Sequence, residues 1–143
     1  MNRRQEREEA FLMLFESEFD KARSADDIYE GASDARGVEE SAYVRQVLTG
    51  VMEHKEELDG LIAKYSHGWR RERLSHVAGA ALLLACYEMC YMDDIPFRVS
   101  INEALELMKK YDEDKARVFV NGVLNAVSHD ETVAKPDKEG EEA

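Results

Sequence analysis

The sequence predicts an all-α protein of about six or seven helices. Only 2 prolines and 8 glycines occur in 143 residues, so the turn residues that hairpin-rich β folds need are scarce. Hydrophobic residues make up 44% of the chain and charged residues 35%, which is enough for an apolar core under a solvated surface. Apolar residues also recur at spacings of three and four along most of the chain, which is the period of an α-helix.

The first predicted helix begins after Asn2, whose side chain can cap the free amides of the first turn. Apolar residues then share one face up to Phe15 and Phe19, which predicts a helix to about Lys21. The next segment, residues 25–37, holds polar residues and two glycines with few apolar side chains. We expect a loop there, with at most one short helix.

The helical period returns in residues 44–51 and again in residues 58–65, on either side of a charged junction. This pattern predicts two amphipathic helices or one kinked helix. A turn follows, and the chain then becomes almost wholly apolar from residue 77 to residue 92, with Glu88 as the exception. That stretch falls short of the roughly 20 residues needed to cross a bilayer, so it predicts a buried central helix and no membrane contact.

Pro96 ends the central helix, because proline lacks an amide proton and restricts the residue before it. Ser100 and Glu103 have the spacing of a capping box, in which each side chain bonds the other residue's amide, and they predict the start of the next helix. A polar break precedes a last helix with apolar residues from 119 to 127. Residues 130–143 carry six acidic and two basic residues and predict a disordered acidic tail.

The motifs that mark catalytic or metal sites are missing from the sequence. It has no glycine-rich nucleotide loop, no HExxH and no spaced zinc ligands, so we expect no cofactor, no metal and no enzymatic activity. Cys86 and Cys90 are too few for a disulfide framework and are better explained as small core residues than as a thiolate pair. The amino terminus is charged where a signal peptide would be apolar, which predicts a cytoplasmic protein.

The formal net charge of −12 argues against nucleic acid binding over the whole surface but leaves room for a local basic patch. Arg3, Arg4 and Arg7 form such a patch in the first two turns of the first helix, where the helix dipole disfavours cations. Their guanidinium groups suit phosphates and unpaired bases, and salt bridges to nearby glutamates are the alternative explanation. A second basic cluster, residues 70–73, lies before the central helix and is either RNA-facing or a solvated turn.

Five segments together carry a family resemblance. They are RRQEREEAFLMLF, LDGLIAKY, CYEMCYMDDIPF, RVSINEALELMKKY and RVFVNGVLNAV. In this order, over about residues 3–127, the chain resembles the NusB family of transcription antitermination factors. The resemblance implies one all-helical domain over residues 1–129, built from two packed helical subdomains of about residues 1–66 and 67–129.

The resemblance also implies a function without catalysis. Family members bind the boxA segment of nascent ribosomal transcripts together with the ribosomal protein NusE, and so help the RNA polymerase antitermination complex pass terminators. The arginine-rich start that contacts RNA in the family corresponds here to Arg3, Arg4 and Arg7. The aromatic residues that resemble NusE contacts are Phe15 and Phe119. Asn121 and Gly122, in the same FVNG motif, are assigned to packing, with Gly122 allowing close helix approach.

The chain departs from the family pattern mainly on this proposed partner face. Polar family positions read Ala78, Gly79 and Leu83 here, and Lys115 stands where the family often has an acidic residue. If Leu83 is exposed beside the two phenylalanines, it enlarges an apolar patch that favours self-association. We therefore expect Leu83 and Lys115 at the partner interface and either a monomer or a weak homodimer.

Two other functions fit the same residues. One is a helical protein-interaction or self-associating module without RNA binding, which the charge of −12 and the altered partner face favour. The other is the RNA-binding appendage of an RNA methyltransferase, since domains resembling NusB also occur in that setting. Binding to boxA RNA by a monomer separates the antitermination adaptor from the interaction module.

Overall fold

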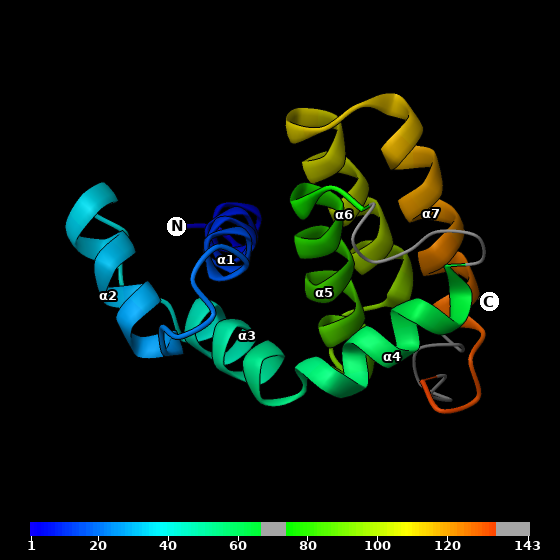
Figure 1. Ribbon diagram of the computed structural model, residues 1–143, viewed down its shortest axis with the longest axis horizontal. Coiled ribbons are helices and arrows are strands. Elements are labelled where there is room, and N and C mark those ends of the chain that lie inside the picture. Colours follow the sequence, from blue (N-terminus) through cyan, green and yellow to red (C-terminus); the bar gives the residue numbers. More distant parts are fainter. Residues whose placement is uncertain (67–73, 134–143) are drawn as a thin grey trace.

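The computed structural model describes residues 1–66 and 74–133, and within these ranges the chain folds into helices without a β-strand (Figure 1). This confirms the predicted all-α class. The described helices are α1 (Arg3–Ser17), α2 (Ala25–Arg36), α3 (Ala42–Glu53), α4 (Lys55–Tyr65), α5 (His76–Tyr91), α6 (Phe97–Tyr111) and α7 (Asp114–Ser128).

Helix α5 is the centre of the fold, as its apolar composition predicts. Its residues from Ala78 to Met89 are all buried, and the helix contacts α1, α3, α4, α6 and α7. Figure 1 shows α1, α2 and α3 on one side of α5, with α6 and α7 on the other. Helix α4 packs on α5 and α7, so its contacts group it with the carboxy-terminal helices rather than with the first three.

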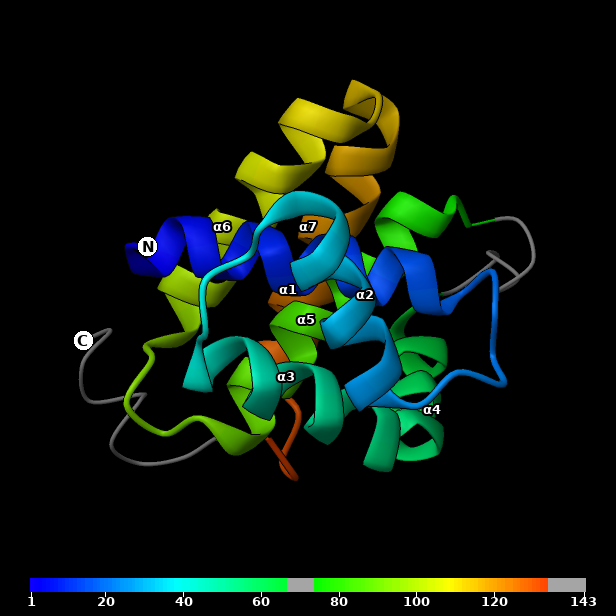
Figure 2. The ribbon, with the colours of Figure 1, turned by 90° about the vertical axis from the view of Figure 1, so that its left-hand side faces the viewer.

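The prediction of a loop over residues 25–37 is wrong, because most of this segment forms helix α2. The Ser24 hydroxyl caps this helix by accepting a hydrogen bond from the Asp27 amide at 3.1 Å. Ile28 and Tyr29 are buried on its inner face, and Gly37 ends it in the left-handed conformation with φ of 65°. Caps at both ends offset the small number of apolar residues, and Figure 2 shows α2 lying across α1 and α3.

The first helix is shorter than predicted. It starts after Asn2, whose side chain accepts from the Gln5 amide while Gln5 bonds the Asn2 amide in return, which confirms the predicted cap. It ends at Ser17 rather than near Lys21, and the Ser17 hydroxyl donates to the Leu14 carbonyl at 2.6 Å. Phe19 therefore lies beyond the helix and is 63% exposed.

The region of residues 44–65 forms two helices, which answers the question left open by the sequence. His54 separates them, with φ of −109° and ψ of 18°, outside the helical range. In α3, Gly50 lies against the ring of Tyr87, and a β-carbon at this position would clash with that ring. This contact lets α3 approach α5 closely.

The predicted capping box at Ser100 is wrong. Helix α6 starts earlier, after Pro96, and the Ser100 amide already donates to the Pro96 carbonyl at 3.2 Å as part of the helix. Ser100 is buried and its hydroxyl donates to Glu88 at 2.8 Å, while Glu103 pairs with arginines of α1. Pro96 is the N-cap residue in an extended conformation with φ of −62°, and the helix starts there without a side-chain cap.

The carboxy-terminal tail starts later than residue 130. Asp130 is buried and accepts from the Tyr65 hydroxyl at 2.6 Å and the Lys64 ammonium at 3.0 Å, and Val133 is also buried. The hydrogen bonds from Thr132, Tyr65 and Lys64 hold the pKa of Asp130 well below its usual range. The rest of the predicted acidic tail, residues 134–143, lies outside the described residues.

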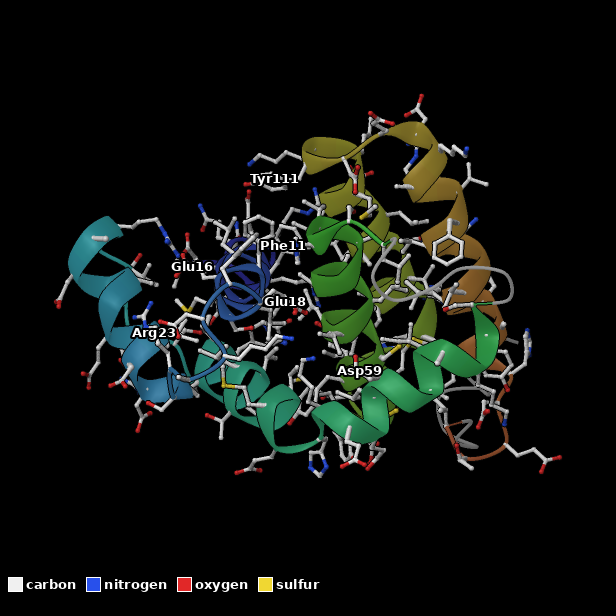
Figure 3. The ribbon with its side chains drawn as sticks, viewed as in Figure 1. Phe11, Glu16, Glu18, Arg23, Asp59 and Tyr111 are labelled. Atoms are coloured by element: carbon white, nitrogen blue, oxygen red, sulfur yellow. The ribbon has the colours of Figure 1, made fainter. Side chains whose placement is uncertain are left out.

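Core packing also accounts for the two cysteines and for one contact between aromatic rings. Cys86 is buried and Cys90 half-buried, and neither forms a disulfide, in agreement with the core interpretation. At the end of α6, Tyr111 lies over Phe11 of α1 with ring centroids 5.3 Å apart (Figure 3). Among the helices of the described part of the chain, none has the length and apolar character to cross a membrane.

Candidate nucleic-acid interface

The start of α1 presents two arginines to solvent. Arg3 donates from Nε to Glu6 at 3.4 Å, and its guanidinium lies 4.4 Å from the ring centroid of Tyr43. Arg4 is the more exposed of the two, with 73% of its side chain accessible. Both arginines keep guanidinium donors at the surface, where phosphates or bases can reach them.

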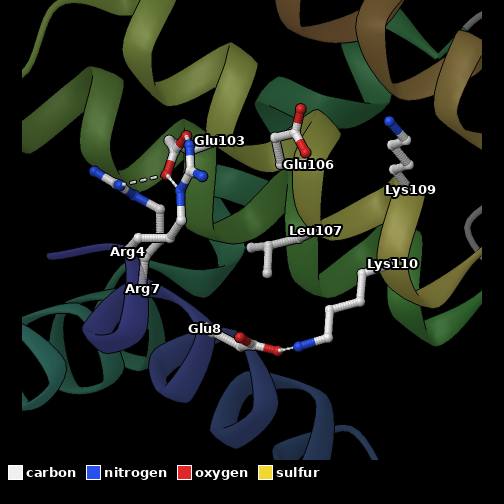
Figure 4. Close-up of a pocket in the computed structure, with 8 residues that line it drawn as sticks. All are labelled: Arg4, Arg7, Glu8, Glu103, Glu106, Leu107, Lys109 and Lys110. Atoms are coloured by element: carbon white, nitrogen blue, oxygen red, sulfur yellow. Dashed lines mark hydrogen bonds and ion pairs between the residues drawn. The ribbon is translucent and has the colours of Figure 1, made fainter. Parts of the chain in front are cut away.

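Arg4 makes a two-point ion pair with Glu103 of α6. Its Nη2 lies 2.7 Å from Oε2 and its Nε lies 3.0 Å from Oε1 (Figure 4). The Arg4 hydrogen bond holds the pKa of Glu103 below its usual range, so this carboxylate is ionised at neutral pH. The pair fixes the start of α1 against α6 and also occupies donors that a phosphate would need.

Arg7 is buried, so the predicted three-arginine surface is wrong at this position. Its Nε donates to Glu88 Oε2 at 2.7 Å, and its Nη1 lies 3.4 Å from Glu103 Oε1. Only 6% of the Arg7 side chain and 1% of the Glu88 side chain are exposed. Arg7 lies three residues after Arg4 on α1 and faces the central helix α5. Glu88 is the one acidic residue of that central helix.

Glu88 of α5 is bonded by side chains from three other helices. Besides Arg7 it accepts from the Tyr43 hydroxyl of α3 and from the Ser100 hydroxyl of α6 at 2.8 Å. Burial and the neighbouring carboxylate raise the pKa of Tyr43, which therefore stays a proton donor. A buried charge needs both a counterion and hydrogen bonds. The Glu88 carboxylate receives them from α1, α3 and α6, so this cluster connects those helices to α5. Sequence reasoning missed it, and the lone Glu88 in an apolar helix was the available signal.

A cavity of about 280 Å³ lies between α1 and α6, next to the Arg4 ion pair (Figure 4). Lys109 and Lys110 line its far end, and Lys110 donates to Glu8 at 2.5 Å. The Glu8 hydrogen bond raises the pKa of Lys110, which stays charged. These two lysines add cations along α6 near Arg4, in a cavity that Glu8, Glu103 and Glu106 also line, and they were not singled out from the sequence.

The predicted partner residues divide into exposed and buried groups. Phe15 is half-buried and lies edge-on to Phe19, with ring centroids 5.1 Å apart. The ring centroids of Phe19 and His76 lie 4.5 Å apart, and this contact was not predicted from the sequence. Phe119 is half-buried on α7, and Lys115 is exposed there. Figure 1 places α1 and α7 on different sides of α5, to which both helices pack.

Leu83 is 1% exposed, so its predicted place in an exposed apolar patch is wrong. Ala78 and Gly79 are buried with it in α5, and this explains why apolar residues are tolerated at all three positions. Asn121 and Gly122 are both exposed, and there is open space where a β-carbon of Gly122 would lie, so the predicted packing role of these two residues is also wrong. The second basic cluster, residues 70–73, lies outside the described residues.

The described residues hold no group of three or more histidine, cysteine, aspartate or glutamate side chains that could bind a metal ion. The buried thiol of Cys86 has a raised pKa because of its burial, so it is a poor nucleophile.

Together, the helical fold and the arginine surface at the start of α1 define an all-helical binding protein. The model of the NusB family matches residues 4–129. The transcription antitermination protein NusB of Bacillus velezensis is 42% identical over 130 residues, which cover 91% of this chain and 98% of that protein. The chain thus belongs to the NusB family.

Solved structures agree with this assignment. A crystal form of NusB from T. maritima has a TM-score of 0.85 at 32% identity, covering 97% of this chain and 98% of that chain. A crystal structure of the antitermination factors NusB and NusE in complex with double-stranded RNA has a TM-score of 0.77 at 26% identity. That match covers 89% of this chain and 97% of the solved one.

Proposed function

We propose that this protein is an RNA-binding transcription antitermination factor. It binds boxA-type RNA in nascent ribosomal transcripts together with the ribosomal protein NusE, acts in the cytoplasm as part of the RNA polymerase antitermination complex, and catalyses no reaction. Membership of the NusB family supports the proposal, as does the likeness to a NusB chain solved with NusE and RNA. The observation that carries it within this chain is the exposed guanidinium of Arg4 beside Arg3.

In this proposal Arg3 and Arg4 contact the RNA, and Arg7 positions them. The exposed arginines supply donors for phosphate oxygens and flat faces for stacking on unpaired bases. Arg7 bonds both Glu88 and Glu103, and Glu103 in turn bonds Arg4, so the buried cluster determines where Arg4 lies. Lys109 and Lys110 continue the positive charge along the same side of α6.

The protein partner contacts Phe15 and Phe119 in the same proposal, with Lys115 near the latter. Phe15 and Phe119 pack against the core yet are partly exposed, which suits residues that become fully buried on binding. The exposed Phe19 and His76 enlarge the apolar surface beside Phe15. Leu83 is left out because its side chain is already buried.

Fluorescence anisotropy with a short boxA RNA tests the RNA surface. The double variant Arg3→Ala, Arg4→Ala should bind more weakly and reduce the slope of log affinity against log salt by about 0.7 for each lost phosphate contact. Arg45→Ala is the matched control, because it removes an exposed arginine from α3. Equal affinity and slope in the double variant and the control would reject this RNA surface.

One observation favours a second function, the self-associating module. Phe19 is a large apolar side chain with 63% exposure, and its ring lies against that of His76 at an interplanar angle of 50°. Sedimentation velocity on the protein and on Phe19→Ser measures this directly. A homodimer that the substitution disrupts, together with no boxA binding by the unchanged protein, would move the function to this module.

A further inference from the structure

A second and larger cavity lies on the other side of the Arg4 ion pair. Its volume is about 630 Å³, and residues of α6, α7 and the start of α1 line it. Figure 2 shows the start of α1 beside α6, and α6 and α7 are packed against each other. We call it the α6/α7 groove, and the residues that matter below are Arg4, Asn102, Glu103, Arg117, Val118 and Asn121.

Two carboxamides face this groove from neighbouring helices. Asn102 is exposed on α6, and its side chain makes no hydrogen bond within the described part of the chain. Asn121 is exposed on α7, and its Oδ1 accepts from Asn125 Nδ2 at 2.8 Å. That bond orients the Asn121 amide so that its own NH₂ group is the donor available to a ligand. Side-chain carboxamides pair with the edges of nucleobases, which carry both donors and acceptors.

An apolar side chain completes the groove. Val118 is 69% exposed, the largest exposure among the large hydrophobic residues of the described chain. It has no role in the core, since the buried face of α7 is formed by other residues such as Val120 and Val123. The flat face of an unpaired base can cover such a side chain, as bases removed from a stack lie against apolar or aromatic groups.

The charges of the groove favour a base rather than a phosphate. Arg4 and Arg117 line it together with Glu103 and Glu106, so the formal charges cancel. A site for phosphate alone would be positive, whereas a nucleobase is neutral and needs hydrogen bonds and apolar contact. Arg4 lines both this groove and the cavity beside Lys109, so the groove adjoins the arginine surface that is proposed to hold RNA.

We propose that the α6/α7 groove binds one unpaired base of a single-stranded RNA, with Asn102 and Asn121 bonding the base edge and Val118 covering its face. The proposal rests on the proposed RNA-binding function and deepens it. It adds a base-reading site to an arginine surface that by itself contacts phosphates and stacks without sequence preference.

The double variant Asn102→Ala, Asn121→Ala tests this site by anisotropy with boxA RNA. Both side chains are exposed, so the fold should be kept, and thermal unfolding checks this. We expect an affinity loss of about tenfold with an unchanged salt slope, because bonds to a base and not to phosphates are removed. Gln46→Ala is the matched control, since it removes an exposed carboxamide from α3.

Abasic RNAs locate the base. Each position of the RNA is replaced in turn by an abasic nucleotide, and each RNA is measured with the unchanged protein and the double variant. One abasic position should weaken binding to the unchanged protein about tenfold and leave binding to the variant unchanged, because both changes remove the same contact. Equal effects on both proteins at every position would overturn the groove site.

The outcomes separate this inference from the function on which it rests. If the unchanged protein binds boxA RNA but the asparagine variant binds equally well, the groove site is wrong and the arginine surface stands. A variant that loses affinity for the ribosomal protein and keeps its affinity for RNA would identify the groove as a protein contact and overturn the inference. No RNA binding by the unchanged protein would overturn both.

Discussion

The buried pair of Arg7 and Glu88 gives the sharpest stability prediction. Arg7→Ala leaves the Glu88 carboxylate inside the protein, 1% exposed, without the guanidinium that pairs with it and with the hydroxyls of Tyr43 and Ser100 still bonded to it. Removing one member of a buried ion pair costs about 3 to 5 kcal/mol, because the remaining charge is uncompensated. For a domain of this length each kcal/mol corresponds to about 4 °C in Tm, so a decrease of roughly 12 to 20 °C is expected.

Thermal unfolding followed by circular dichroism measures this loss. Arg4→Ala is the control on the same helix, and it should leave Tm nearly unchanged because the Arg4 side chain is 73% exposed. The double variant Arg7→Met, Glu88→Leu removes both charges and should recover part of the stability lost by Arg7→Ala. A Tm for Arg7→Ala within about 3 °C of the unchanged protein would refute the structural role of Arg7.

Three further predictions follow from the same contacts. Glu103→Gln removes the charge that competes with phosphate for Arg4, so boxA affinity should increase about twofold to fivefold by anisotropy, and an unchanged or lower affinity would contradict this. The lowered pKa of Asp130 means that its stabilising contribution is complete above about pH 4, the unfolded value, and is lost as the pH falls toward the folded one. Asp130→Asn should therefore lower Tm by roughly 5 °C at pH 7 and flatten the dependence of Tm on acid pH, and parallel pH profiles for the two proteins would exclude this role. Leu83→Ala should lower the free energy of unfolding in urea by about 2 to 5 kcal/mol without changing affinity for the ribosomal protein partner. Unchanged stability with a loss of that affinity would show that Leu83 is a contact residue.

The helical period predicted most of the fold, because helix formation depends on residues that are close together in the sequence. The buried central helix, the cap at Asn2 and the helical character of residues 44–65 follow from spacing and local hydrogen bonding, whereas the break into two helices at His54 was left open. Helix α2 was missed because its caps, Ser24 and Gly37, stabilise a segment with few apolar residues. In that case the local capping signals were present in the sequence and outweigh the weak hydrophobic pattern.

The site was harder to predict because its partners are far apart in the chain. Arg3 and Arg4 are exposed as expected, yet Arg7 is turned inward by Glu88, which lies 81 residues later. Glu103 was assigned to a local cap and is instead the partner of Arg4, 99 residues away. Ion pairs of this kind depend on tertiary packing, so the spacing of the arginines on one helix cannot distinguish a surface cation from a buried one.

Binding of boxA RNA is the most direct test of the central proposal. We would measure it by fluorescence anisotropy on the unchanged protein, at two salt concentrations and with or without the ribosomal protein partner. The account predicts specific binding that weakens with salt and becomes tighter when the partner is present. Equal affinity for boxA and for an unrelated RNA, with no effect of the partner, would contradict it.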